Sequence, residues 1–410
     1  MKKSYYHSEM ERFIRFLVPK ESSLLEIKSG ITIQNLAGHK PYDYIILSDT
    51  IGSLSDIQKS LQEFHTITHD QSRVIITHYN YLWEPALKAA EKLHIKKPQS
   101  LQNWVSMKDL ENFLYLGGFE VVKKGHLLLL PFYIPLLSTF MNRYLAKLPL
   151  IQKLCLSYYI IARPIPYEPY PRASVSVIIP ARNEEGNIEP LIKKMPSLGT
   201  HTEIIFVEGH STDNTLKKIE EVKKKYPAFD IKITTHEGKG KGDAVRKGFD
   251  LAKSDILMIL DADITVVPED LPKFYQALIE GKGDFINGSR LIYPLEKNSM
   301  RFLNILGNKF FGLAFTWLLG QRMRDTLCGT KALWKKDYER IKTGRAFFGD
   351  FDPFGDFDLL FGAAKLNLKI VDLPIRYQER TYGTTNIKRF SHGLLLLKMC
   401  FFVMGKIKFI

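Results

Sequence analysis

The sequence feature that most constrains the fold is the run Ile256–Leu260, which ends in Asp261-Ala262-Asp263. Five apolar residues are too few for a buried helix of ordinary length, so the run predicts a strand covered on both faces. In an open α/β sheet, ligands collect at the carboxyl ends of the strands. Two carboxylates at such an end, separated by a small residue, suit a hard divalent cation that binds phosphate oxygens. A solvated turn is the alternative, because aspartate is common after strands.

Three further predicted strands, over 174–179, 203–207 and 230–235, precede this run. Each leads into a polar loop, and these loops carry Asn183, Glu184, Glu208 and Lys239. Because the carboxyl ends of parallel strands meet at one edge of a sheet, we expect these side chains to converge with the two aspartates. This convergence favours a nucleotide cleft over four unrelated polar turns. Lys241 would add positive charge near the phosphates, although the Gly238–Gly242 loop lacks the spacing of a P-loop.

Size and charge set the broad class of the protein. A length of 410 residues favours two domains, and the net charge of +14 favours anionic partners such as phosphorylated substrates or an acidic membrane surface. Three scattered cysteines indicate a reducing compartment and lack the spacing of a zinc site. No apolar core follows the basic start, so a signal peptide is not expected, and no apolar stretch reaches the roughly 20 residues of a spanning helix.

Residues 1–162 alternate between predicted strands and helices, which indicates a parallel or mixed sheet. The strands are expected at 24–27, 43–49, 73–77, 119–122 and within 127–137, and the helices at 54–64, 84–93 and 107–116. A polyproline connector is predicted for 163–172, because four prolines occur within nine residues. A second domain would then cover 173–390, and an amphipathic helix would cover 391–410.

The layout of the first domain resembles that of the class I S-adenosylmethionine-dependent methyltransferases. Glu26–Gly30 lies where that family has its acidic, glycine-rich cofactor loop, and Asp43–Asp49 is similar to its fourth strand. That family places a helix, a strand and another helix between these two segments, whereas only residues 31–42 intervene here. Lys28 also stands where glycine would allow close approach of a cofactor. We therefore expect a truncated, Rossmann-like methyltransferase-type domain that does not bind S-adenosylmethionine, with a structural or docking module as the alternative reading.

Residues 173–390 resemble the family 2 glycosyltransferases of GT-A fold, and among them the dolichol-phosphate mannose synthase-like group. Pro180–Glu185 matches the opening loop of that group, Asp261-Ala262-Asp263 its metal-binding triplet, and Asp325–Lys331 its later acceptor-site loop. One departure is that Glu208-Gly209 stands where the family usually has two aspartates. This departure leaves the choice between a GDP- and a UDP-hexose donor open.

The resemblance implies roles for individual residues. The nucleotide would be bound by Pro180, Ala181, Asn183, Glu184, Glu208, Lys239 and Asp261. Mg²⁺ or Mn²⁺ would be bound by Asp261 and Asp263, and the acceptor phosphate by Arg290 and Arg301. Asp263, Asp356 and Arg380 would be catalytic, with Arg380 clamping a phosphate and Asp356 facing the acceptor. A solvent-facing helix charge is the alternative reading of Arg301.

Two apolar segments, Leu303–Leu319 and Leu394–Ile410, are predicted to lie in a membrane interface, with core helices as the alternative. The resulting hypothesis is a cytoplasmic enzyme, peripheral on the inner face of the membrane, with no nucleic-acid partner. It would transfer a hexose, with inversion, to a polyprenyl phosphate or another lipid-linked acceptor. The alternatives are transfer to a soluble or polysaccharide hydroxyl, and a non-catalytic nucleotide-binding scaffold.

Overall fold

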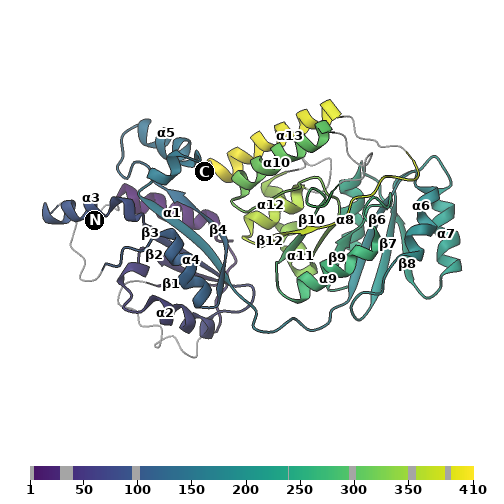
Figure 1. The fold of residues 1–410 in the computed structure, drawn as a ribbon, viewed down its shortest axis with the longest axis horizontal. Coiled ribbons are helices and arrows are strands. Elements are labelled where there is room, and N and C mark those ends of the chain that lie inside the picture. The colour runs from purple at the N-terminus through teal and green to yellow at the C-terminus, as the bar shows by residue number, and fades with distance from the viewer. Residues whose placement is uncertain are drawn as a thin grey trace. The chain divides into compact units, whose positions relative to one another are not determined.

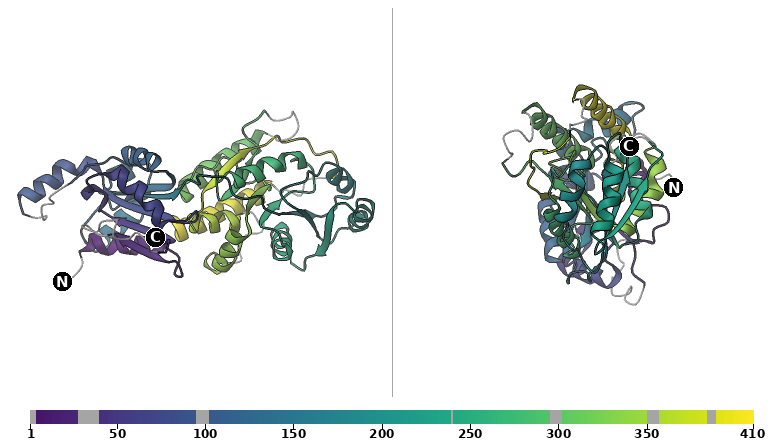
Figure 2. Two further views of the ribbon diagram at one scale, coloured as in Figure 1. Left: turned by 90° about the horizontal axis from the view of Figure 1, so that it is seen from below. Right: turned by 90° about the vertical axis from the view of Figure 1, so that its right-hand side faces the viewer.

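The computed structural model describes residues 4–27, 40–94, 102–238, 240–294, 302–349, 357–383 and 389–410. The chain forms two compact units, each with its own sheet (Figures 1 and 2). Unit 1 contains Met1–Tyr167 together with Ile407–Ile410, and unit 2 contains Glu168–Lys406.

Unit 1 is built on a five-stranded mixed sheet with the strand order β1-β2-β3-β5-β4. Its strands are β1 (Leu24–Ile27), β2 (Tyr44–Ser48), β3 (Arg73–Tyr79), β4 (Phe119–Leu127) and β5 (Ser157–Pro164). Its helices are α1 (Tyr5–Leu17), α2 (Ile57–Glu63), α3 (Glu84–Lys92), α4 (Met107–Leu116) and α5 (Leu137–Arg143). The first three strands are parallel, and β5 is antiparallel to both of its neighbours.

Both faces of this sheet are covered, as the alternation of side chains along β2 shows. Ile45 and Leu47 belong to one apolar cluster, which includes Leu61 of α2 and Leu110 of α4. Tyr44 and Ile46 point to the other face, where they join a cluster that includes residues of α1. Because successive residues of a strand face opposite sides, a strand buried on both faces is apolar throughout, as the sequence indicated.

Two predictions for unit 1 were wrong. The run 127–137 is not a closing strand: Leu127 ends β4 and Leu137 begins α5. The last strand of this unit along the chain is β5, which pairs with β3 on one side and β4 on the other. Arg163 and Pro164 therefore belong to the sheet and not to the predicted connector. Pro164, which has no backbone N–H to donate, is the last residue of the strand. Arg163 is buried, and its Nη2 lies 2.6 Å from Oε1 of Glu120.

Unit 2 is built on a seven-stranded sheet with the order β12-β10-β11-β9-β6-β7-β8. Its strands are β6 (Val175–Ala181), β7 (Thr202–Glu208), β8 (Asp230–Thr235), β9 (Ile256–Ile259), β10 (Phe285–Ser289), β11 (Lys331–Trp334) and β12 (Ile370–Pro374). Its helices are α6 (Glu185–Lys193), α7 (Thr215–Lys225), α8 (Lys241–Leu251), α9 (Leu271–Ile279), α10 (Phe302–Leu319), α11 (Lys335–Gly344), α12 (Phe357–Lys365) and α13 (Arg389–Val403). The strands β9, β6, β7 and β8 are parallel, and β11 runs antiparallel to β9 and β10.

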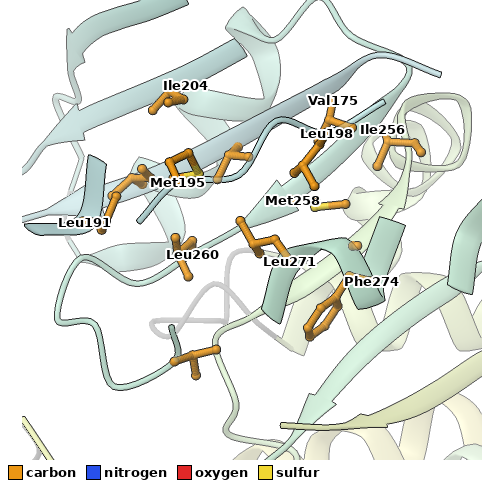
Figure 3. Close-up of a cluster of buried hydrophobic side chains, with 14 of the residues drawn as sticks. Val175, Leu191, Met195, Leu198, Ile204, Ile256, Met258, Leu260, Leu271 and Phe274 are labelled. Atoms are coloured by element: carbon orange, nitrogen blue, oxygen red, sulfur yellow. The ribbon is translucent and has the colours of Figure 1, made fainter. Parts of the chain in front are cut away.

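The core of unit 2 explains why β9 is apolar along its whole length. Every residue of β9 is buried, and Ile256 and Met258 pack in one cluster with Leu271 and Phe274 (Figure 3). This packing fixes the strand, so the acidic residues that follow it emerge at a defined edge of the sheet. Within the described parts of the chain, none of the helices is long and apolar enough to span a membrane.

Candidate active site

The polar residues that follow β9 lie at the edge of the sheet where β6, β7 and β8 also end (Figure 1). Oδ1 of Asp261 lies 2.7 Å from Nζ of Lys241, the first residue of α8. Burial alone would raise the pKa of Asp261, but the charges of Lys241 and Lys331 outweigh it and hold this pKa below its ordinary value. The carboxylate is therefore ionised at neutral pH and able to bind a cation.

Gly329 lies against the pair of Asp261 and Lys241. A Cβ atom on this glycine would overlap Oδ2 of Asp261 and Nζ of Lys241. The loop that precedes β11, which the sequence analysis assigned to the acceptor site, therefore reaches the first aspartate of the triplet. Only a residue without a side chain allows this approach.

Asp263 is held by a different set of contacts. Its Oδ2 accepts a hydrogen bond from Nη2 of Arg380 at 2.6 Å, and its Oδ1 accepts from the backbone N–H and the hydroxyl of Thr265 at 3.1 and 2.7 Å. Nη1 of Arg380 donates to Oε1 of Glu184 at 3.2 Å. Arg380 thus bridges the loop after β6 and the loop after β9.

Glu184, one of the two acidic partners of Arg380, is a buried residue. Its Oε2 accepts from Nδ2 of Asn187 at 2.6 Å, and its backbone N–H donates to Oγ1 of Thr215. Burial raises the pKa of Glu184, and the positive charge of Arg380 offsets only part of this effect. The carboxylate therefore depends on Arg380 for its charge compensation.

Asn183 connects the loop after β6 to the loop after β7. It adopts a positive φ of 57°, which asparagine tolerates better than most residues. Its side-chain oxygen accepts from the backbone N–H of Thr212 at 2.8 Å, and its own N–H donates to Oγ of Ser211 at 3.0 Å. Pro180 and Ala181 are the last residues of β6, and the carbonyl of Ala181 accepts from the N–H of Gly209.

Glu208 stabilises its own turn. Its carboxylate oxygens accept from the backbone N–H groups of His210 and Ser211 at 3.1 and 2.6 Å. Burial opposes ionisation of this carboxyl, but the hydrogen bonds from Ser211 outweigh burial and lower its pKa. Nε2 of His210 lies 2.8 Å from the carbonyl of His236, so the ends of β7 and β8 are joined beside Glu208.

Arg290, which was expected to contact the acceptor phosphate, forms a buried bidentate ion pair with Asp325. Nε and Nη2 of Arg290 donate to Oδ2 and Oδ1 of Asp325 at 2.7 and 2.9 Å. The backbone N–H of Arg290 donates to the same carboxylate, and its guanidinium lies 5.0 Å from the ring centre of Tyr377. This ion pair holds the end of β10 to the loop before β11.

The segment that contains Arg380 folds over the start of α6. The ring of Tyr382 lies where a Cβ on Gly186 would be, and Gly383 has a φ of +77° beside Nη1 of Arg380 and the carbonyl of Asn183. The predicted opening and closing loops therefore touch each other, although they lie at opposite ends of the second predicted domain.

Three predicted site residues, Lys239, Arg301 and Asp356, lie outside the described residues. The structure brings together Glu184, Asp263 and Arg380, and it separately pairs Asp261 with Lys241. Sequence reasoning missed the contacts of Gly329, Asn187 and Thr265. The spacing Glu-x-x-Asn at the start of a helix and the spacing Asp-x-Thr in a turn were the available signals for the last two.

Two of these residues, Asp261 and Asp263, could bind a divalent metal ion. Among the residues that the structure describes, no group of three or more His, Cys, Asp or Glu side chains could form a complete metal site. Asp261 and Asp263 nevertheless provide carboxylate oxygens, which Mg²⁺ and Mn²⁺ prefer. Mg²⁺ commonly binds through one or two carboxylates together with phosphate oxygens of the substrate, so two aspartates are sufficient for a metal that arrives with a nucleotide.

Residues 176–341 match the family model "Glycosyl transferase family 2". The match lies within unit 2, whose mixed sheet with helices is of the α/β class that the resemblance implied. The match does not extend into unit 1, whose likeness to a methyltransferase stays a prediction.

The particular relatives are named glycosyltransferases. The chain is 38% identical over 219 residues to the dolichol-phosphate mannosyltransferase of Pyrococcus furiosus, covering 52% of this chain and 59% of that protein. It is 27% identical to the UDP-N-acetylglucosamine–dolichyl-phosphate N-acetylglucosaminyltransferase of Methanococcus voltae, covering 55% of this chain and 96% of that protein. A solved structure of glucosyl-3-phosphoglycerate synthase from Mycobacterium tuberculosis is 19% identical, with 57% and 80% of the two chains covered. The TM-score of this comparison is 0.41.

Proposed function

We propose that unit 2 transfers a hexose from a GDP- or UDP-sugar, with inversion, to a polyprenyl phosphate or another lipid-linked phosphate, with Mg²⁺ or Mn²⁺. The observation that carries this proposal is the arrangement of Asp261 and Asp263 at one sheet edge, with Lys241 and Arg380 beside them. Carboxylates alternating with cations suit a metal-bound diphosphate. The names of the Pyrococcus and Methanococcus relatives, both acting on dolichol phosphate, support the acceptor class.

In this proposal the residues of the chain bind the diphosphate and position the acceptor. A divalent ion on Asp261 and Asp263 would supply Lewis-acid stabilisation of the departing nucleoside diphosphate. Arg380 would exchange its contact with Asp263 for a phosphate oxygen, because a guanidinium binds both kinds of oxyanion through the same paired donors. Lys241 would add a second positive charge near the leaving group.

The transfer itself forms one bond and breaks one bond. An oxygen of the acceptor phosphate would attack C1 of the sugar from the side opposite the diphosphate, and the bond between C1 and the diphosphate oxygen would break. An acceptor phosphate is already ionised, so this reaction requires no general base. A hydroxyl acceptor would require one, and Asp356 would then be the candidate.

Two helices of unit 2 support a membrane-bound acceptor. Along α10, Leu306, Phe310 and Leu313 are exposed at intervals that place them on one helix face. Helix α13 lies beside α10 (Figure 1). It exposes Leu394 and Phe401. We propose that these residues enter the lipid interface and that the protein is peripheral on the cytoplasmic face of the membrane.

We assign unit 1 no part in the transfer and no S-adenosylmethionine. The acidic residue that follows β2, Asp49, accepts hydrogen bonds from the hydroxyl of Tyr6 at 2.6 Å and from Thr77 at 3.2 Å. Tyr6 is a buried residue of α1. Because the carboxylate of Asp49 binds side chains of the protein itself, we favour a structural or docking role for unit 1. Calorimetry with S-adenosylmethionine should therefore give no binding heat.

The test of the transfer proposal is an assay with radiolabelled GDP- and UDP-hexoses and a polyprenyl phosphate, with Mn²⁺ or with EDTA. We expect label in the organic phase only when metal is present, and loss of that label in Asp263→Asn. Asp255→Asn is a matched control, because Asp255 lies at the opposite end of the same strand, where it binds Ser174. Label confined to a water-soluble or polysaccharide product would support the hydroxyl alternative. Binding of the donor without any turnover would support the non-catalytic nucleotide-binding scaffold.

A further inference from the structure

The segment of unit 1 from 128 to 154 has an inverted distribution of polar and apolar side chains. The buried residues of α5 are Ser138 and Asn142, whereas Leu137 and Phe140 of the same helix are exposed. A helix that packs on a protein core normally does the opposite. The apolar face of α5 is therefore available for contact with something other than the core of unit 1.

The exposed apolar residues are held in place by the buried polar ones. The side chain of Asn142 accepts from the N–H of Leu130 and donates to its carbonyl, both at 2.8 Å. The hydroxyl of Ser138 accepts from the N–H of Ile134 at 2.7 Å and donates to the carbonyl of Phe132 at 2.8 Å. These bonds pair both backbone groups of Leu130, the carbonyl of Phe132 and the N–H of Ile134, and they fix the shape of the segment.

Six apolar side chains of this segment form what we call the exposed apolar patch. We define it by its six members Phe132, Tyr133, Leu136, Phe140, Leu150 and Leu154, all of them more than half exposed. Leu136 and Leu150 are 88% and 81% exposed, so neither contributes much to the core. Exposed apolar side chains gathered in one segment, unlike those scattered singly over a surface, mark a contact with another protein or a membrane.

The charge of the segment distinguishes between these partners. Between Gly125 and Ala162 the charged residues are Arg143, Lys147 and Lys153, and there is no aspartate or glutamate. Arg143 and Lys153 are exposed. Leucines and aromatic rings combined with cations, and without anions, are the composition of surfaces that insert into anionic membranes, where aromatic rings occupy the headgroup level.

We propose that this patch, Phe132 to Leu154 of unit 1, is a membrane-docking surface that inserts into the interface of a bilayer containing anionic lipids. Its residues belong to unit 1, whereas α10 and α13 belong to unit 2, and the proposal does not depend on the transfer reaction. Its role is to hold the chain at the surface where a lipid-linked substrate is found. The function of unit 1 is then to attach the protein to the membrane.

The test uses the full chain and vesicles of phosphatidylcholine with or without 30% phosphatidylglycerol, separated by sedimentation (about 100 mM salt). We expect binding to the anionic vesicles, and at least a tenfold weaker binding of the double variant Leu136→Ser/Leu150→Ser. Lys153→Glu should weaken binding to anionic vesicles more than to neutral ones, because it reverses a charge. The control variant Leu93→Ser/Tyr115→Ser changes two residues of unit 1 that are 70% and 71% exposed outside the patch, and it should bind as the wild type does.

Two outcomes would overturn the proposal. One is unchanged vesicle binding of Leu136→Ser/Leu150→Ser, with an unchanged melting temperature. The other is a wild-type dimer, measured by light scattering, that this variant converts to a monomer, because the patch would then join two copies of the chain. Donor binding by calorimetry separates this test from the transfer proposal, since the docking variant should retain it whatever the acceptor is.

Discussion

Nη2 of Arg380 lies 2.6 Å from Oδ2 of Asp263, while Nη1 of the same guanidinium lies 3.2 Å from Oε1 of Glu184. One side chain thus joins two acidic residues that follow different strands of the sheet. A planar guanidinium can form both contacts at once, whereas a lysine ammonium is a single point charge. Arg380 is therefore a residue whose shape matters as much as its charge.

For this reason, Arg380→Lys should lower kcat/KM at least tenfold, and Arg380→Ala should lower it about 100-fold, which corresponds to roughly 2.7 kcal/mol. The assay is transfer from the sugar nucleotide that binds best with Mn²⁺. The exposed Arg376, four residues earlier, provides the control variant Arg376→Lys. Wild-type kcat/KM in Arg380→Ala would remove this residue from the mechanism.

Gly329→Ala should weaken the affinity for donor and metal about tenfold, because the new Cβ would displace Asp261 or Lys241. Calorimetric titration with Mn²⁺ and nucleoside diphosphate measures this effect. Gly344→Ala is the matched control, since a Cβ at that helical glycine has no neighbour within 4 Å. If both variants had the same affinity for Mn²⁺ and nucleoside diphosphate, the loop before β11 would be able to move away from Asp261 without a loss of binding free energy.

Asp325→Asn should lower the free energy of unfolding by about 3–5 kcal/mol, because it leaves the Arg290 guanidinium buried without a counter-charge. The double variant Arg290→Met/Asp325→Leu should cost less than the single one, since it removes both charges. Denaturant titration gives both values. The idea fails if the double variant is the less stable of the two.

The stability of unit 1 should fall on acidification because of His78. This imidazole is fully buried, Nε2 lies 3.1 Å from the carbonyl of Asn103, and burial lowers its pKa from 6.5 to about 4. The unfolded chain therefore takes up a proton between pH 6.5 and 4 that the folded protein excludes, so stability is complete above pH 6.5 and falls toward pH 4. At 1.36 kcal/mol per pKa unit the loss is about 3 kcal/mol.

The variant His78→Gln has no titratable group at this position and should lack this part of the pH dependence. The measurement is denaturant unfolding of both proteins at pH 7.5 and pH 4.5. Carboxylates titrate in the same range, so the quantity to compare is the difference between the two proteins. A difference that does not change with pH would show that His78 is protonated in the folded state.

The strands that surround the candidate site could be predicted because their signal is local. The apolar run before Asp261, and the runs before Asn183 and Glu208, are short and end in polar loops, and the structure has strands β9, β6 and β7 there. The apolar run from 127 to 137 has the same composition, yet Leu127 ends β4 and residues 132–136 form an exposed loop before α5. Apolar composition indicates that a segment avoids water, but it does not say whether the core or an external surface covers it.

The sequence by itself determined the strands that lead into the candidate site and the identity of the polar residues at their ends, because these depend on neighbours within a few positions. Only the tertiary structure decided which charges meet: Arg290 with Asp325, Lys241 with Asp261, and Arg380 with Asp263, 117 residues away in the chain. It also placed β5 between β3 and β4. Ion pairs and strand pairings depend on distance in space, and that distance is set by the packing of the whole sheet.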